Sequence, residues 1–156
     1  MKTKFFIAVL IIALAFGPVV GQQIEIFRTV TINNGKSVSL GEDFSRISDL
    51  FESVGDMYGL KKGLYGGAEK IRVQVGDGQR IKAIHFIYGD KKDFRASVKG
   101  YELSLGERTG EQNKDLSNLK FRKIFWEDTR TRFEMIEREQ NGKVSVSSIL
   151  FDKSGL

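Results

Sequence analysis

Alternating apolar and polar positions predict strands at the start, the middle and the end of the chain. Residues 24–32 alternate with β-branched side chains and end at Asn33-Asn34-Gly35, which is a strong turn signal. The same alternation predicts strands on both sides of Gly76-Asp77-Gly78. Three further strands are expected at 119–127, 130–139 and 143–152, and Asn141-Gly142 joins the last two as an antiparallel hairpin.

Apolar positions at helical spacing predict two short helices. The first follows a capping-box pattern at Ser39 and Glu42, ends at Gly55, and has the apolar stripe Phe44, Ile47, Leu50, Phe51 and Val54. The second is capped by Asp90, ends before Gly106, and has the stripe Phe94, Val98, Tyr101 and Leu105. Residues 56–68 are rich in glycine and residues 107–118 are polar without periodicity, so we expect both to be loops.

A three-residue loop at residues 76–78 separates apolar from polar side chains best in the central hairpin. It places Val73 opposite Ile81, and the only histidine, His85, opposite Glu69. A two-residue loop would pair Val73 with Lys82 and put cations among the valines. The preferred register therefore places three cations on the face opposite to the apolar side chains: Arg72, Arg80 and Lys82.

Together these elements predict an α+β domain in which two short helices pack on one face of an antiparallel sheet of five or six strands. Residues 22–156 suit a single domain. Residues 39–88 and 89–152 follow the same plan of helix, loop and hairpin. A divergent tandem helix-plus-hairpin repeat explains this likeness, and so does the alternation of such units that is common in α+β domains of this size.

The motif from Leu40-Gly41 through Phe51 to Gly55, followed by a charged hairpin, resembles the small secreted modules of the β-lactamase-inhibitor-protein-like fold. That fold also includes envelope lipoproteins of the outer-membrane assembly type. The resemblance covers most of residues 39–152 and implies a protein-binding envelope module without catalytic residues. The chain departs from these relatives because it has no cysteine for lipidation or disulfides. A cystatin-like or transport-factor-like curved sheet with a ligand pocket would need one long helix instead of two short ones.

The first 21 residues have the features of a cleaved secretory signal peptide. Lys2 and Lys4 precede an apolar run at residues 5–16, and Val19-Val20-Gly21 suits cleavage after Gly21. The run is too short for a retained membrane anchor, so we expect no transmembrane segment after cleavage. Export without cysteine favours a secreted or periplasmic protein of a bacterial envelope.

Charge narrows the partners that this chain could bind. The formal net charge is +5, and removal of Lys2 and Lys4 leaves +3, which is too low to predict nucleic-acid binding. The cations concentrate between residues 61 and 99. They could face an envelope protein or an anionic glycan or lipid surface, although such a charge run is more often a solvated face.

No pattern in the sequence predicts catalysis. His85 has no second histidine and no metal-ligand spacing around it, so we interpret it as a structural residue. The glycines at 63–67 and 76–78 lack the spacing of a phosphate-binding loop. We therefore expect no catalytic residue, no metal and no cofactor.

Trp126 precedes a turn close to Arg130 and Arg132, so this hairpin is one candidate partner-binding site. The alternative for Trp126 is that it covers the edge of the core. The cations of the central hairpin, Arg72, Arg80 and Lys82, form the other candidate. The sequence thus favours an exported, non-catalytic binding or assembly module of the bacterial cell envelope. The alternative is a small secreted hydrolase that uses loop carboxylates near residues 55–67.

Overall fold

A computed structural model describes residues 25–90 and 92–155, which form ten strands, one α-helix and four short 3-10 turns. The chain order is β1 (Thr29–Thr31), β2 (Ser37–Ser39), the turns Phe44–Arg46 and Ser48–Leu50, β3 (Phe51–Val54), β4 (Met57–Leu60), β5 (Lys70–Val75), the turn Asp77–Gln79, β6 (Ile81–Gly89), α1 (Phe94–Leu105), β7 (Gly110–Leu116), β8 (Leu119–Glu127), β9 (Thr131–Gln140), β10 (Lys143–Asp152) and the turn Lys153–Gly155.

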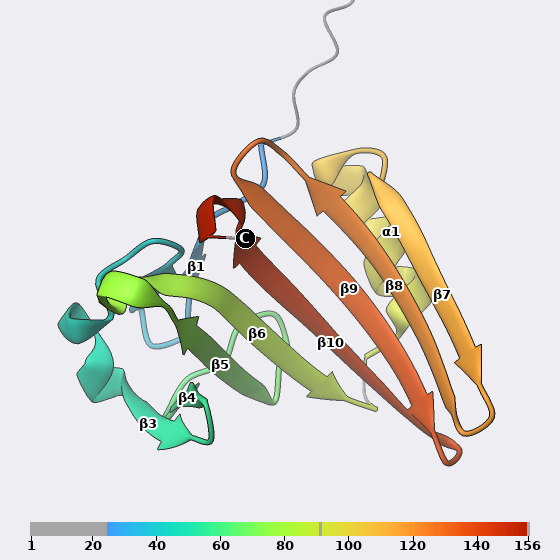
Figure 1. Ribbon diagram of the computed structural model, residues 1–156, viewed down its shortest axis with the longest axis horizontal. Coiled ribbons are helices and arrows are strands. Elements are labelled where there is room, and N and C mark those ends of the chain that lie inside the picture. The colour runs from blue at the N-terminus through green and yellow to red at the C-terminus, as the bar shows by residue number, and fades with distance from the viewer. Residues whose placement is uncertain (1–24, 91, 156) are drawn as a thin grey trace, which may run out of the picture.

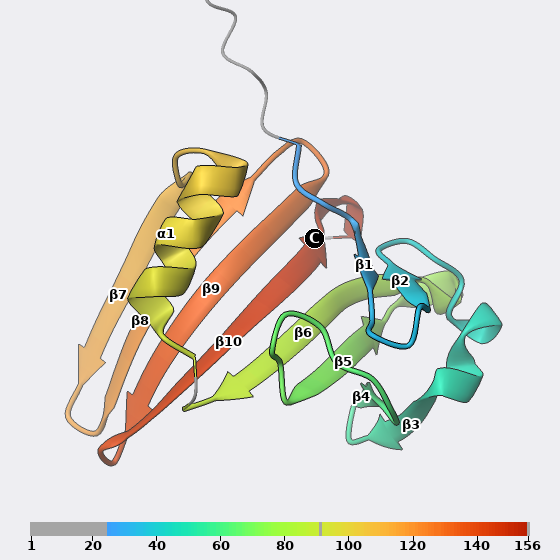
Figure 2. The same ribbon diagram turned by 180° about the vertical axis from the view of Figure 1, so that it is seen from behind.

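Eight strands form one antiparallel sheet in the order β3-β4-β5-β6-β10-β9-β8-β7, and β1 pairs only with β2. Figure 2 shows α1 and the β1–β2 hairpin in front of this sheet, whereas Figure 1, seen from the other side, shows the strands in front. We call the two sides the helix face and the open face. The helix face carries Phe86, Leu150, Phe133 and Trp126, and the open face carries Arg72, His85, Ile87, Ile149, Phe151, Arg132, Glu134, Ile136, Lys123, Phe125 and Phe121.

The core lies on the helix face, beneath α1 and the β1–β2 hairpin with its flanking segments. Asp93 caps the helix by accepting a hydrogen bond from the Ala96 N–H at 3.0 Å, and the Gly106 N–H closes its last turn. The Tyr101 ring lies 4.6 Å from that of Phe133 and 5.9 Å from that of Trp126. Trp126 is fully buried and donates its Nε1–H to the Gly106 carbonyl at 3.1 Å. This one side chain therefore ties the sheet to the end of the helix.

Two partly buried carboxylates attach the N-terminal segment to the end of the sheet. Asp128 accepts hydrogen bonds from the backbone N–H groups of Ile26, Arg130 and Thr131 at 2.6–2.7 Å. Asp152 forms an ion pair with Arg28, whose guanidinium also donates to Thr131 Oγ1 at 2.8 Å. Burial opposes ionisation of both aspartates. The backbone hydrogen bonds to Asp128, the Ser154 hydrogen bonds to Asp152 and the nearby Arg28 outweigh it and lower both pKa values.

The predicted fold class is wrong in its number of helices and strands. The first expected helix, from Glu42 to Gly55, is two 3-10 turns followed by β3. The Ser39–Glu42 contact exists, since the Glu42 carboxylate accepts from the Ser39 N–H at 3.1 Å, but no helix follows it. Phe51 pairs with Leu60 of β4, and the Phe44 ring lies 4.4 Å from that of Tyr58. The apolar spacing at the end of this short segment is compatible with a helix and with a strand, and pairing with β4 selects the strand.

The sheet gains strands inside both segments that we expected to be loops. β4 lies within residues 56–68 and β7 within residues 107–118. β7 is exposed along nearly its whole length, so its sequence carries no apolar alternation to detect. The expected helix-plus-hairpin repeat is also wrong for the first half, which has no α-helix. Each half instead contributes four consecutive strands, and the sheet order is symmetric about the β6–β10 pair.

The predicted register of the central hairpin is wrong by three positions. Val73 pairs with Ile84, and His85 pairs with Arg72 and not with Glu69. The connection is longer than three residues because a 3-10 turn at Asp77–Gln79 and a bulge after Gln74 extend it. Other expectations are confirmed. The strands expected at 119–127, 130–139 and 143–152 are present, the second of them at 131–140. The Asn141-Gly142 turn has both φ angles positive, and α1 ends at Gly106, although its cap is Asp93 and not Asp90.

The predicted signal peptide, residues 1–21, lies outside the described residues. No helix among the described residues is long and apolar enough to span a membrane.

Replacement of Trp126 tests its role in the core. We expect Trp126→Ala to lower the free energy of unfolding by about 3–5 kcal/mol, because it opens a cavity and leaves the Gly106 carbonyl without its donor. Urea unfolding followed by circular dichroism measures this change. Leu103→Ala, at a helix position that is 82% exposed, is the control and should change stability by less than about 0.5 kcal/mol. Equal losses in the two variants would contradict the proposed packing.

Acid should weaken the attachment of the N-terminal segment. The pKa of Asp128 in the folded protein is below its ordinary value of 3.8. Its contribution to the free energy of unfolding is therefore complete above pH 3.8 and is lost as the pH falls through the folded-state pKa. Asp128→Asn should therefore destabilise the protein at pH 7 and flatten the loss of stability on acidification, as measured by urea unfolding at a series of pH values. Asp115→Asn, in exposed β7, is the control that should retain the wild-type acid profile.

Candidate partner-binding face

A strip of aromatic and cationic side chains crosses the open face from β6 to β7. The ring of His85 lies 6.4 Å from the Phe151 ring in an edge arrangement, and Phe151 pairs with Arg132 on β9. The Arg132 guanidinium lies 3.9 Å from the centroid of the Phe125 ring. That ring in turn covers Gly110 on β7, where a Cβ atom would lie 2.4 Å from the Phe125 Cζ. The strip is therefore continuous over five strands.

Period-two alternation explains why these residues share one face. On β10, Leu150 points into the core, so Ile149 and Phe151 on either side of it point the other way. On β8, Ile124 and Trp126 are buried in the core, and Phe125 between them faces outward. Half-burial of Ile149, Phe151 and Phe125 arises from contacts between neighbouring strands, since no described element covers them.

A buried carboxylate organises the cations of this face. Glu134 is 6% exposed and lies 3.2 Å from Lys123 Nζ and 2.9 Å from Arg132 Nε, both measured from its Oε1 atom. The Arg132 Nε contact lacks the alignment of a hydrogen bond and is an ion pair only. One carboxylate thus contacts two cations, and a second carboxylate, Glu127, lies 3.9 Å from Arg132 Nη1 through its Oε2 atom.

His85 lies in a cationic and half-buried environment. It pairs with Arg72 on β5 and with Ile149 on β10, and its Nε2 atom has no hydrogen-bond partner among the described residues. Burial lowers the pKa of His85, the Arg72 charge lowers it further, and Asp56 opposes the shift weakly. The imidazole is therefore neutral at pH 7 and adds hydrogen-bonding capacity without charge.

The six residues predicted to bind a partner lie in different parts of the fold. Trp126 is buried on the helix face and has no exposed surface to offer a partner. Arg72 and Arg132 share the open face, separated by β6 and β10, which places their strands about 14 Å apart. Arg130 is exposed in the β8–β9 turn. Arg80 donates to the Gly41 carbonyl at 2.9 Å, and the Lys82 chain covers Gly76, so both lie at the hairpin end.

Sequence reasoning missed the apolar part of the open face. The phenylalanines at 121, 125 and 151 have the spacing of core residues, but all three lie on the open face, together with Ile136 and Ile149. A signal was present in residues 121–126, where apolar side chains occupy both odd and even positions. Such a strand carries apolar side chains on both faces of a sheet.

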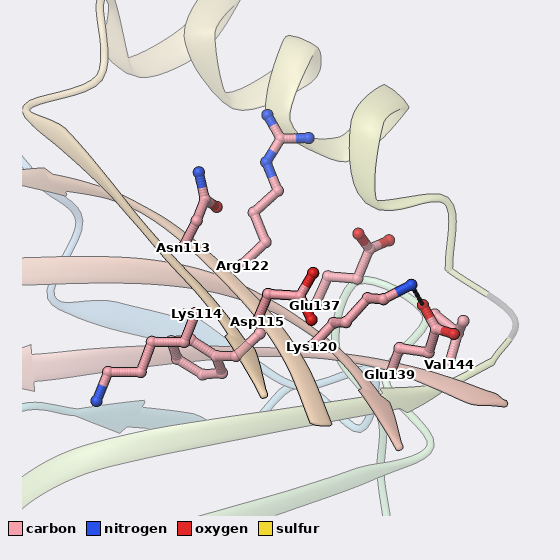
Figure 3. A pocket seen from close by; sticks show the side chains of 9 residues that line it. Asn113, Lys114, Asp115, Lys120, Arg122, Glu137, Glu139 and Val144 are labelled. Atoms are coloured by element: carbon pink, nitrogen blue, oxygen red, sulfur yellow. Dashed lines mark ion pairs between the residues drawn. The ribbon is translucent and has the colours of Figure 1, made fainter. Parts of the chain in front are cut away.

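A hollow of about 470 Å³ lies at the end of the helix face that α1 leaves uncovered (Figure 3). Cross-strand pairs place Lys120 between Asp115 and Glu139, and Arg122 between Asn113 and Glu137. The Lys120 Nζ to Glu139 Oε2 distance is 3.6 Å. Each cation here has a carboxylate neighbour, so the hollow is a balanced charge ladder, which stabilises strand pairing.

The described residues include no group of three or more acidic or histidine side chains that could hold a metal ion. The carboxylates of Glu42 and Asp43 accept hydrogen bonds from the backbone N–H groups of Ser39 and Ser45. Such hydrogen bonds from the backbone to side-chain carboxylates stabilise turns.

Comparison with protein-family models, with curated proteins and with solved structures found no match to this chain. The resemblance to β-lactamase-inhibitor-protein-like modules therefore stays a prediction.

The environment of His85 can be tested by NMR titration of its ring protons. We expect a pKa below 6.5 in the wild type, and a partial rise toward that value in Arg72→Gln, because burial is the larger cause and stays in place. Since the folded-state value is lowered, acidification below about pH 6.5 should protonate His85 more readily in the unfolded chain and reduce stability. Arg130→Gln, which removes an exposed arginine elsewhere, should leave the titration unchanged.

Proposed function

We propose that the protein is a non-catalytic binding module of the bacterial cell envelope that holds an acidic protein partner against the open face. The observation that carries this proposal is an apolar set of side chains on an uncovered sheet face, set among cations. The apolar set is Ile87, Phe121, Phe125, Ile136, Ile149 and Phe151. The location in the envelope rests on the predicted signal peptide.

The apolar strip has the composition of a protein interface. Aromatic side chains and arginine are enriched at the centres of protein–protein contacts, where they supply most of the binding free energy. The Arg132 guanidinium lies 3.9 Å from the centroid of the Phe125 ring. The ring packs on Gly110 and the guanidinium pairs with Glu134, so both side-chain conformations are fixed before binding. Little side-chain entropy is lost when such a pair is covered by a partner.

The charge of the open face favours an acidic partner. The strand register places seven cations and three carboxylates on this face: Lys70, Arg72, Lys114, Lys123, Arg132, Arg138 and Lys143 against Glu52, Glu127 and Glu134. A second copy of the chain would bring like charges together, which opposes association. A bilayer is a poorer fit, because the apolar side chains are half-buried between strands and do not project toward acyl chains.

Site-specific photo-cross-linking in the native host tests this proposal. A benzoylphenylalanine in place of Ile149 on the open face should form an adduct with an acidic protein, identified by mass spectrometry. The same probe in place of Leu103, on the exposed side of α1, is the matched control and should form none. Adding Arg72→Glu to the Ile149 probe should reduce the adduct about tenfold, because it reverses a charge facing the acidic partner.

Four outcomes would overturn the proposal. An adduct of twice the mass of the chain would assign the face to self-association, and an adduct with lipid would assign it to the membrane surface. Equal adducts from both probe positions, or none from either, would exclude a specific docking role for the open face. No observation on the described residues favours the alternative of a secreted hydrolase.

A further inference from the structure

A second hollow, of about 530 Å³, lies between α1 and β8 on the helix face, and we call it the α1–β8 cleft. Its floor is Phe94, Val98 and Ile124, which are at most 6% exposed. Arg95 and Lys99 line it from the helix, and Arg108 and Arg122 line it from the side of the sheet. The volume lies within the range of about 300–1,000 Å³ that small-molecule sites occupy.

The helix places its two cations on one side of the cleft. Arg95 and Lys99 are four positions apart in α1, so they lie one above the other, beside the buried stripe of Phe94 and Val98. Neither cation forms an ion pair with any residue that the structure describes. The floor is closed, so a ligand would contact these side chains from the solvent and would not enter the core.

The two arginines on the sheet side are oriented by one carboxylate. Glu111 accepts from Arg122 Nε at 3.0 Å and pairs with Arg108 Nη1 at 3.1 Å. The Arg122 guanidinium also lies 5.5 Å from the centroid of the Phe94 ring. Figure 3 shows Arg122 rising from the sheet toward the helix, with its terminal nitrogens at the far end of the side chain. Because Nε is already bonded to Glu111, these terminal nitrogens stay available as donors.

The excess of cations in the cleft is absent from the hollow beside it on the helix face, which is lined by Lys120, Asp115 and Glu139. In that hollow, Lys120 lies between two carboxylates, and Arg122 has Glu137 on one side. In the cleft, four cations line the walls against two carboxylates, Glu102 in the lining and Glu111 beside Arg108 and Arg122. Glu102 lies 3.7 Å from Arg108, which leaves the helix cations without a counter-charge.

We propose that the α1–β8 cleft binds a phosphate ester. Arginine donors match phosphate oxygens in a planar, bidentate arrangement, and lysine adds a point charge. Arg122 and Arg108 would supply oriented donors from one side, while Arg95 and Lys99 would close on the anion from the other. The ester could be a soluble sugar phosphate or the headgroup of an anionic lipid, since the two present the same chemistry.

Calorimetric titration of the purified protein tests this site with two probes. Glucose 1-phosphate represents the soluble ester, and vesicles of phosphatidic acid in phosphatidylcholine represent the headgroup. The double variant Arg95→Gln/Lys99→Gln should weaken binding of whichever probe binds by about tenfold or more, because it removes two charge-assisted donors. Arg46→Gln/Lys36→Gln loses the same charges at exposed positions outside the cleft and is the matched control, which should bind as the wild type does.

Binding of either probe that depends on the double variant supports the proposal, and the probe that binds identifies the source of the phosphate. Equal weakening by the control variant would show a nonspecific effect of net charge and would overturn it. The absence of saturable binding of both probes would overturn it as well. Since this test uses no protein partner and no residue of the open face, its result is independent of the proposed docking function.

Discussion

β10 pairs with β6 in six positions, from Val146 opposite Gly89 to Phe151 opposite Ala83, and this pairing joins two groups of four strands into one sheet. The paired segments are far apart in the sequence: the buried hydrogen bond between the Tyr88 and Ser148 hydroxyls, at 3.1 Å, links positions 60 residues apart. Closing so long a loop costs conformational entropy, which the continuous core on the helix face offsets. The core, the open face and the cleft all depend on this junction.

The size of the sheet explains why one face stays uncovered. Eight strands at a spacing of about 4.8 Å span about 34 Å. The 12-residue α1 is about 18 Å long and about 10 Å wide, so it covers only a few strands. The β1–β2 hairpin and its flanking segments cover part of the remaining helix face. No described element is left for the opposite face, where side chains are shielded only by their cross-strand neighbours.

Charge is distributed differently over the three polar surfaces, although the same kinds of side chain build them. In the hollow at the end of the helix face, cations and carboxylates alternate across the strand pairs, as in the ladder of Lys120 with Asp115 and Glu139. The α1–β8 cleft has unbalanced cations because the helix brings Arg95 and Lys99 toward a sheet that already holds Arg122. On the open face Glu134 and Glu127 pair with Lys123 and Arg132, and the excess of positive charge comes from other cations, such as Arg72 and Lys114.

The sequence alone determined the strands with one buried face, such as 143–152, because burial of alternate residues leaves a period of two. It also determined the tight turn at Asn141-Gly142 and the end of α1 at Gly106, where local backbone conformation decides. Only the tertiary structure decided that 51–54 is a strand, since pairing with β4 competes there with a helical pattern. Only pairing between distant strands decided which face Phe125 and Phe151 occupy, because a local sequence pattern does not identify the strands that pair with it.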